Sequence, residues 1–392
     1  MDFELSKEHR DIQLAAREFA KKEIEPVAEQ MDREECFPME LWRKMGDLGF
    51  LGINVPEEYG GAGYELLAGI LVCEQIYRVS PGLGNSYGVQ ANLVSHNLNR
   101  NGNHEQKKKY LPGLSSGELV GALALTEPGA GSDAVGIQTT AVRDGNAFVL
   151  NGSKIYISNA PIADVFITYT KTDLEKKARG ITAFLVERGF PGLDADHKLE
   201  KMGIRASPNG EVFFDNCRVP EGNILGEVNG GIDVMMSGLD VERAFFASGA
   251  LGLAEGAFEL ALTYSKKREQ FGQPICNFQL IQAKLADMYT EIEAARGLVY
   301  RAAVIADKAE RGGKGTEMHK LATAAMLFTS QMAVRVCNEA LQVHGGYGYM
   351  MECPINRFYR DAKIIDIGGG TLEIRRLVIA RELLARGLEY PP

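Results

Sequence analysis

The chain has 392 residues, of which 45% are hydrophobic and 24% are charged, and its net charge is −9. This length is enough for two or three domains with large cores, and the composition is that of an ordinary globular protein. The acidic balance argues against nucleic-acid binding, which requires basic patches that neutralise phosphates.

The six cysteines include no C-x-x-C pair, so neither a zinc site nor a dithiol redox motif is predicted, and no metal is expected. Scattered cysteines in a long chain are typical of a reduced, intracellular protein. The acidic start from Met1 to Leu5 has no signal-peptide pattern, and no apolar stretch is predicted to cross a bilayer. We therefore expect a cytoplasmic location, although the sequence does not separate a bacterial protein from a processed organellar one.

Residues 1–118 are predicted to form an all-α N-terminal domain. Apolar residues recur at helical spacing from Leu5 to Ala20, and Pro38 opens another helix. The glycine-rich segment 56–63 predicts a loop, because glycine permits turns that other residues resist. A longer apolar helix is predicted from Leu66 to Tyr77.

Residues 119–231 change character and are predicted to form a middle β-domain. Runs rich in β-branched and aromatic residues occupy 147–150, 165–169, 181–186 and 211–214. The first run lies between the turn signals Asp144-Gly145 and Asn151-Gly152. The spacing of these runs predicts a small antiparallel barrel or sandwich.

Residues 232–392 are predicted to form a C-terminal α-helical domain. Helical patterns cover 233–266, 278–309, 316–343 and 373–387, and their short connections favour an antiparallel four-helix bundle. The order is helical, β, helical, so the fold class is α+β.

Three glycine-rich loops carry groups that suit a phosphorylated ligand. The chain has no G-x-G-x-x-G after a strand and no Walker A sequence, so neither a Rossmann nor a P-loop site is predicted. The loops are 126–133, 344–348 and 368–371, and the last of these precedes a helix start, where bare N–H groups suit anions. Taken singly, each loop is weak evidence for a ligand site, because glycine clusters more often form tight turns and the 126–133 loop could be a capped surface turn.

Taken together, three blocks resemble the acyl-CoA dehydrogenase family in order and spacing. Leu125–Asp133 looks like the family's flavin-binding signature. A second block is Gln342–Tyr349 followed by Arg357–Lys363, and a third is Arg268–Pro274 with Gln279. The resemblance covers essentially the whole chain. It implies the acyl-CoA dehydrogenase-like fold with a central small β-barrel, FAD as cofactor and a homotetramer.

The resemblance also implies a set of cofactor-binding residues. One group would line the flavin ring and its diphosphate: Leu123, Leu125, Thr126, Gly131 and Ser132. The other face of the ring would be covered by Tyr156, Ile157 and Ser158, where most relatives have Trp in place of Tyr156. The FAD of a neighbouring subunit would be reached by Arg268, Gln270, Phe271, Gln279, Gln342, Val343, His344, Gly345 and Gly346. Thr371 and Glu373 would complete the FAD site.

The position of the catalytic base departs from that of most relatives. They carry a glutamate in a Glu-Gly-Thr sequence, where this chain has Gly369-Gly370-Thr371. A subgroup that includes the isovaleryl-CoA dehydrogenases supplies the base from another helix, and residues 237–243 match it, so the resemblance implies that Glu242 is the base. Asp366 is the alternative. Without the resemblance, Glu242 would be interpreted as an exposed helix carboxylate in an ion pair.

The implied reaction removes the α proton of an acyl-CoA thioester while the β hydride moves to the flavin. A desolvated carboxylate is a stronger base, and hydrogen bonds to the thioester carbonyl stabilise the developing enolate. The resemblance places Ser132, Asp240 and Arg243 near the substrate and its CoA portion, with Gly369 and Gly370 at the reacting end.

Gly368 and Gly369 leave room where relatives place Tyr and Glu, which favours a branched short-chain substrate, with isovaleryl-CoA as the first choice. Ile365 replaces an aromatic residue common in that subgroup, so cyclic, aromatic-substituted and dicarboxylyl thioesters stay open. The expected electron acceptor is an electron-transferring flavoprotein, and an oxidase-like relative that uses O₂ is the alternative. A non-catalytic member of the fold is disfavoured by the three retained flavin blocks.

Overall fold

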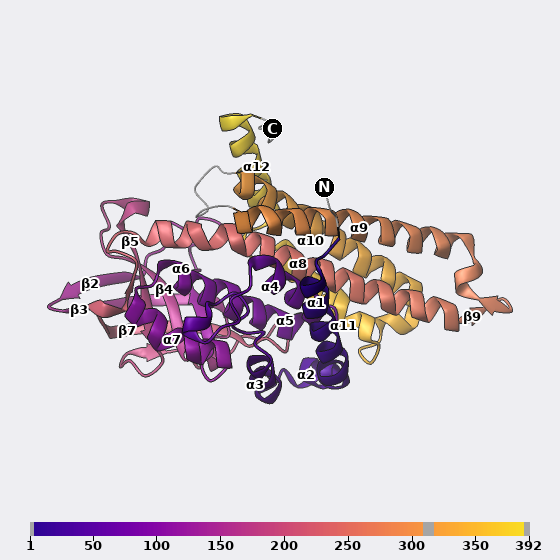
Figure 1. The fold of residues 1–392 in the computed structure, drawn as a ribbon, viewed down its shortest axis with the longest axis horizontal. Helices are drawn as coiled ribbons and strands as arrows, with labels where there is room; N and C mark the ends of the chain where they lie inside the picture. Colours follow the sequence, from indigo (N-terminus) through magenta and orange to yellow (C-terminus); the bar gives the residue numbers. More distant parts are fainter. Residues whose placement is uncertain (1–3, 309–316, 388–392) are drawn as a thin grey trace.

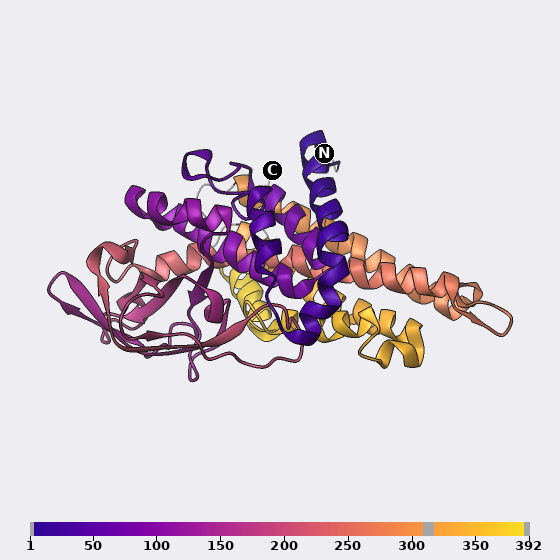
Figure 2. The ribbon, with the colours of Figure 1, turned by 90° about the horizontal axis from the view of Figure 1, so that it is seen from below.

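The structure, a computed structural model, describes residues 4–308 and 317–387. Three parts follow one another along the chain: helices, then strands, then long helices (Figure 1). In both views the large sheet lies at one end of the long axis, and the hairpin that contains β9 (Glu269–Gln270) lies at the other (Figure 1 and Figure 2). The boundaries after residues 118 and 231 stay a prediction.

The N-terminal part is helical, as predicted. Its α-helices are α1 (Lys7–Phe19), α2 (Ala28–Glu34), α3 (Met39–Asp47), α4 (Leu66–Tyr77), α5 (Pro81–Gly88), α6 (Asn97–Asn101) and α7 (His104–Ser116). Two π-helical stretches, η1 (Ala20–Ile24) and η4 (Val89–His96), interrupt this pattern. Helix α4 has the predicted bounds, and all twelve of its residues are buried, because it packs against α1, α8 and α9.

The middle part is one twisted sheet with strand order β6-β7-β3-β2-β4-β5-β8, in which β1 also pairs with β4. Its strands are β1 (Gly121–Ala124), β2 (Thr140–Asp144), β3 (Ala147–Ser158), β4 (Val165–Lys171), β5 (Ile181–Glu187), β6 (Leu193–Asp194), β7 (Asn209–Pro220) and β8 (Ile224–Leu225). Most pairs are antiparallel, but β1 and β2 run parallel to β4. The strand runs predicted from sequence lie within β3, β4, β5 and β7.

The C-terminal part contains four long helices, with bounds within a few residues of those predicted. They are α8 (Gly231–Lys267), α9 (Gln279–Lys308), α10 (Glu317–His344) and α12 (Leu372–Arg386). A shorter helix, α11 (Pro354–Ala362), was not predicted, and a hairpin of β9 (Glu269–Gln270) and β10 (Gln273–Pro274) joins α8 to α9.

Helix α8 supplies many residues of the main hydrophobic core. By length and composition it could cross a membrane, but 72% of its apolar window is buried inside the protein. Burial of this kind is typical of a core helix. The main hydrophobic cluster contains residues of α4, α8, α9 and α10, so the N-terminal and C-terminal helices share one core.

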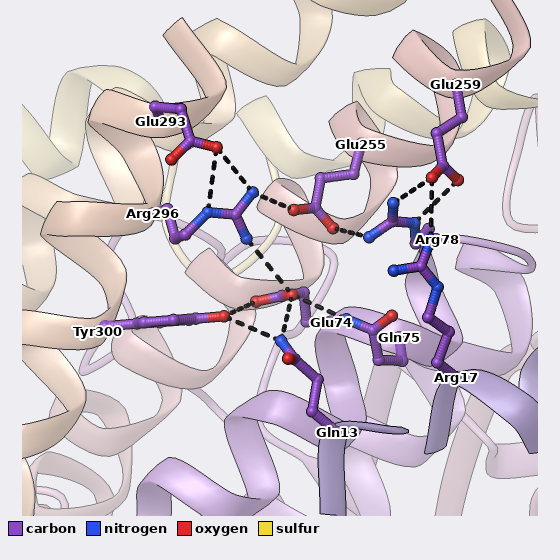
Figure 3. Close-up of polar contacts among 10 residues, drawn as sticks. All are labelled: Gln13, Arg17, Glu74, Gln75, Arg78, Glu255, Glu259, Glu293, Arg296 and Tyr300. Carbon is purple, nitrogen blue, oxygen red and sulfur yellow. Dashed lines mark hydrogen bonds and ion pairs between the residues drawn. The ribbon is translucent and has the colours of Figure 1, made fainter. Parts of the chain in front are cut away.

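A buried polar network lies where α1, α4, α8 and α9 meet (Figure 3). Glu74 is fully buried and accepts hydrogen bonds from Gln13, at 3.3 Å, and from the Tyr300 hydroxyl, at 2.9 Å. The carboxylate of Glu255 lies between two guanidinium groups, 2.8 Å from Arg78 and 2.6 Å from Arg296. Burial and the charge of Glu255 raise the pKa of Glu74 to about 8.

Candidate active site

Glu242 is a buried carboxylate in the first half of α8, and 7% of its surface is exposed. Burial raises the pKa of this carboxyl to about 7, whereas the charges of Arg243 and Arg375 act in the opposite direction. Within residues 4–308 and 317–387 no hydrogen bond or ion pair engages the carboxylate, although both arginines act on it electrostatically. The interpretation as an exposed, ion-paired carboxylate is therefore wrong.

The loop between η10 (Lys363–Asp366) and α12 brings Gly369 against this carboxylate. Gly369 and Gly370 have φ angles of 65° and 93°, a region that favours glycine. A Cβ atom on Gly369 would lie 3.3 Å from Oε1 of Glu242 and 3.9 Å from its Cδ. Any side chain at position 369 would therefore crowd Glu242.

The alternative base, Asp366, is also buried, with 8% of its surface exposed. Its Oδ2 atom accepts a hydrogen bond of 2.9 Å from Nζ of Lys363, while its Oδ1 atom has no partner. One oxygen of Asp366 is therefore engaged in an ion pair, in contrast to the carboxylate of Glu242.

The loop after β1 is held in shape by a buried ion pair. The Glu127 carboxylate lies 2.7 Å from Nζ of Lys154, and Lys154 is fully buried. The same carboxylate accepts hydrogen bonds from the backbone N–H and the hydroxyl of Thr139, at 3.0 and 2.6 Å. Lys154 also donates to the carbonyl of Leu125 at 3.1 Å. These contacts hold the segment that contains Thr126, so Glu127 acts as an internal support.

The predicted ligand residues of this loop lie at its surface. Leu123, Leu125 and Thr126 are half-buried, and Gly131 and Ser132 are exposed. A Cβ atom placed on Gly131 would meet nothing within 4 Å, so its backbone is open to a ligand.

The adjoining part of β3 brings only some of the predicted residues to this face. Tyr156 has a φ of 61° and is 67% exposed, at an irregularity in the β3–β7 pairing between Lys154 and Ile157. Ile157 is 3% exposed and packs in the β core, so only its backbone can face a ligand. Ser158 Oγ accepts a hydrogen bond of 3.3 Å from Asn85.

A second group of predicted residues lines a cavity of about 780 Å³ at the far end of α8 and α10. Arg268, Gln270, Val343, His344, Gly345 and Gly346 contribute to its lining, together with Lys267. The His344 ring stacks on Tyr264, with centroids 4.4 Å apart, and burial lowers the pKa of His344. The His344 ring is therefore held by packing on the ring of Tyr264.

The remaining members of this second group are exposed. Phe271 is 94% exposed because it occupies the tight turn of the β9–β10 hairpin, with a φ of 51°. Gln279, at the start of α9, and Gln342, near the end of α10, are exposed beside this end of the molecule.

The remaining predicted site residues lie at the start of α12 and on α8. Thr371 caps α12, because its hydroxyl accepts a hydrogen bond of 3.4 Å from the backbone N–H of Ile374, and Glu373 lies exposed in the first turn. Arg243 is buried, with one guanidinium nitrogen 3.3 Å from Nδ1 of His319. The side chain of Asp240 lies outside the described residues.

Comparison with known proteins identifies the family. The models of the acyl-CoA dehydrogenase N-terminal, middle and C-terminal domains match residues 6–118, 122–217 and 229–384. The mitochondrial isovaleryl-CoA dehydrogenase of Solanum tuberosum is 46% identical over 368 residues, which are 93% of this chain and 88% of that protein. The chain belongs to the acyl-CoA dehydrogenase family.

Two solved structures are similar to this acyl-CoA dehydrogenase. Butyryl-CoA dehydrogenase from Megasphaera elsdenii has a TM-score of 0.94 and 40% identity, and the match covers 98% of this chain and 100% of that one. A glutaryl-CoA dehydrogenase from Mycobacterium smegmatis in complex with FADH2 has a TM-score of 0.91 and 31% identity, covering 98% and 97%. The predicted fold class, enzyme class and FAD cofactor are confirmed.

The residues of this acyl-CoA dehydrogenase fit FAD, but a single chain does not bring all of them together. The Thr126 loop follows β1, which pairs with β4 at the strand end of the molecule, whereas Arg268 and Gly345 lie beside β9 at the opposite end (Figure 1). The open backbone at Gly131 and the positive charges of Lys267 and Arg268 both suit a diphosphate cofactor. Within residues 4–308 and 317–387, no group of three or more His, Cys, Asp or Glu is placed to hold a metal ion.

Sequence reasoning missed three residues that shape the site. The Glu127–Lys154 pair holds the loop that contains Thr126, and Arg375 is 1% exposed beside the Gly369 loop. Arg375 stands in an amphipathic helical pattern, where an arginine is normally exposed. Only the packing of α12 on α10 shows that it is buried.

Proposed function

We propose that this acyl-CoA dehydrogenase uses Glu242 as the base that removes the substrate's α proton. The observation that carries the proposal is a buried carboxylate facing a residue without a side chain, with Glu242 Oε1 3.3 Å from the position of a Cβ on Gly369. Position 369 is where most relatives carry their glutamate. The Glu242 carboxylate therefore borders the same small space as that position.

Each group in this arrangement has a defined task. Glu242 accepts the α proton in its ionised form, and a pKa of about 7 leaves roughly half of the molecules ionised at neutral pH. The backbone N–H of Gly369 has no acceptor among the described residues, so it is free to donate a hydrogen bond to the thioester carbonyl. Bound FAD supplies the acceptor for the hydride that leaves the β carbon.

We propose a branched short-chain acyl group, with isovaleryl-CoA as the first candidate. Support comes from the 46% identical isovaleryl-CoA dehydrogenase and from the space above Gly368, where an added Cβ would have no neighbour closer than 3.4 Å. Relatives that act on butyryl-CoA and glutaryl-CoA share the fold, so straight-chain and dicarboxylyl thioesters belong in the test, as do cyclic and aromatic-substituted ones.

We further propose a homotetramer in which one subunit contributes Arg268, Gln270 and the His344–Gly346 segment to the FAD bound at the Thr126 loop of another. The separation of these two groups within one chain supports this proposal. An electron-transferring flavoprotein is the proposed acceptor, with O₂ as the alternative, and a cytoplasmic location stays a prediction.

The test is anaerobic flavin reduction by a panel of isovaleryl, butyryl, glutaryl, cyclohexanecarboxyl and phenylpropionyl thioesters of CoA. Wild type, Glu242→Gln and the control Asp366→Asn are compared at equal FAD content. We expect wild type to lose its yellow colour fastest with the branched isovaleryl thioester. Glu242→Gln should bind that thioester without reduction, and Asp366→Asn should still be reduced.

Three results would overturn parts of the proposal. Reduction of Glu242→Gln at the wild-type rate would transfer the role of base to another residue, with Asp366 the first to examine. If a straight-chain or dicarboxylyl thioester reduces the flavin fastest, the proposal of a branched substrate would be overturned. Rapid recolouring of the reduced enzyme in air would identify an oxidase.

A further inference from the structure

Arg375 is a fully buried guanidinium without an ion-pair partner among residues 4–308 and 317–387. It lies in the first turn of α12 and is 1% exposed. Burying a charge is costly unless hydrogen bonds and an opposite charge compensate for it. An arginine kept in such a place therefore needs an explanation.

Its hydrogen bonds connect the Gly369 loop to α10. The guanidinium donates to the carbonyls of Ile365, at 2.9 Å, and of Gly368, at 2.5 Å. A third hydrogen bond of 2.6 Å reaches Oγ of Ser330 on α10. Because Gly368 directly precedes Gly369, these contacts fix the position of the residue that faces Glu242.

The charge of Arg375 also acts on Glu242. The Arg375 charge lowers the pKa of Glu242, and the carboxylates of Glu242 and Asp366 raise the pKa of Arg375, although burial leaves it at about 10. In the part of the chain that the structure describes, the second cation that acts on Glu242 is Arg243, on α8 itself.

Other charged and titratable groups act on Glu242 directly, contact Arg243 or lie in the segment before the Gly369 loop. Tyr169 on β4 interacts with the charge of Glu242, and His319 on α10 contacts Arg243. On η10, Lys363 pairs with Asp366. Among these groups, Arg375 is the one that both contacts the Gly369 loop and acts on the carboxylate.

We propose that Arg375 is a positioning residue, whose buried guanidinium anchors the Ile365–Gly368 segment to α10 and whose positive charge keeps the Glu242 carboxylate ionised. This inference rests on the proposed role of Glu242 as the base. It assigns to α12 a task in proton abstraction that is separate from the binding of the cofactor.

The test compares Arg375→Gln, Arg375→Lys and Ser330→Ala with wild type. The matched control is Arg376→Gln, which removes the same charge from the neighbouring, exposed position of α12. The rate of anaerobic flavin reduction is measured from pH 5.5 to 9, with FAD content and circular dichroism as checks of folding.

We expect Arg375→Gln to move the acidic limb of the pH profile upward by about one pH unit, so that reduction at pH 6 slows about tenfold. Arg375→Lys keeps the charge and loses the forked hydrogen bonds, so its acidic limb should stay near that of wild type while the rate at high pH falls. Ser330→Ala and Arg376→Gln should keep the wild-type midpoint. If Arg375→Gln fails to fold, a shifted midpoint in Arg375→Lys would overturn the role of the charge.

A readout without substrate separates this inference from the proposed function. The infrared band of the protonated Glu242 carboxyl, identified by its loss in Glu242→Gln, is followed through a pH titration of the FAD-loaded enzyme. Its midpoint should rise in Arg375→Gln, whether or not Glu242 proves to be the base. An unchanged midpoint together with an unchanged pH profile would overturn the inference.

Discussion

Replacing Gly369 by alanine tests the contact on which the site depends. The new methyl group would lie 3.3 Å from Oε1 of Glu242, tighter than an ordinary van der Waals contact, so the carboxylate or the loop must move by a few tenths of an ångström. Misplacement by 1 Å can reduce an enzymatic rate about 100-fold, so a shift of this size predicts a loss of about threefold to tenfold. The φ of 65° adds a destabilisation of about 1–2 kcal/mol.

Gly145→Ala provides a matched control for this experiment. Gly145 lies in the turn between β2 and β3 and has a φ of 63°, but its Cβ would meet nothing within 4 Å. Both variants should lose similar stability in urea unfolding, while flavin reduction at saturating acyl-CoA should slow about threefold to tenfold in Gly369→Ala and less than about twofold in Gly145→Ala. Equal rates in the two variants would refute the reasoning, because backbone strain alone would then account for both.

Three further predictions concern buried charges. With the Glu242 pKa at about 7, reduction by acyl-CoA should speed up about tenfold between pH 6 and pH 8 in stopped-flow measurements, and a flat profile would contradict the role of Glu242. Because the pKa of Glu74 is raised to about 8 in the folded protein, its bound proton stabilises the fold. This stabilisation is complete below about pH 4 and is lost as the pH rises through 8. The free energy of unfolding of Glu74→Gln, measured in urea, should therefore fall less than that of wild type between pH 6 and pH 9, and parallel curves would argue against a bound proton. Glu127→Gln leaves the Lys154 ammonium buried without its counter-charge. The free energy of unfolding in urea should therefore fall by about 3–5 kcal/mol. The double variant Glu127→Gln/Lys154→Met, which also removes the buried ammonium, should recover most of this loss. A single variant as stable as wild type would show that the pair is dispensable.

The sequence predicted the elements whose pattern is local. Helix α4 was found with its bounds because only Glu74 and Gln75 interrupt its apolar residues, a composition that suits a helix buried all round. The four strand runs were found because β-branched residues lay between turn signals. Helix α11 was missed because it is only nine residues long and mixes apolar residues such as Ile355 and Phe358 with polar ones. Its burial against α8 and α10 depends on tertiary contacts.

What depends on distant parts of the chain could not be predicted from local patterns. The parallel pairing of β1 and β2 with β4 is invisible in strand spacing. The side chain of Ile157 enters the β core because of the irregularity at Tyr156, which breaks the alternation of faces on which a sequence prediction relies. Arg375 was missed for the same kind of reason, since its burial is decided by α10 and by the loop that it contacts.

The geometry connects the loss of a loop carboxylate to the presence of one on α8. A glutamate at position 369 would begin with a Cβ 3.3 Å from Glu242, so two carboxylates would share one desolvated space, and their repulsion would keep one of them protonated. A single carboxylate on α8, with a glycine opposite, avoids this conflict and leaves the loop backbone to donate its hydrogen bond. Since α8 is anchored in the main core along most of its length, a base on this helix is held by packing, while the loop opposite depends on the hydrogen bonds of Arg375.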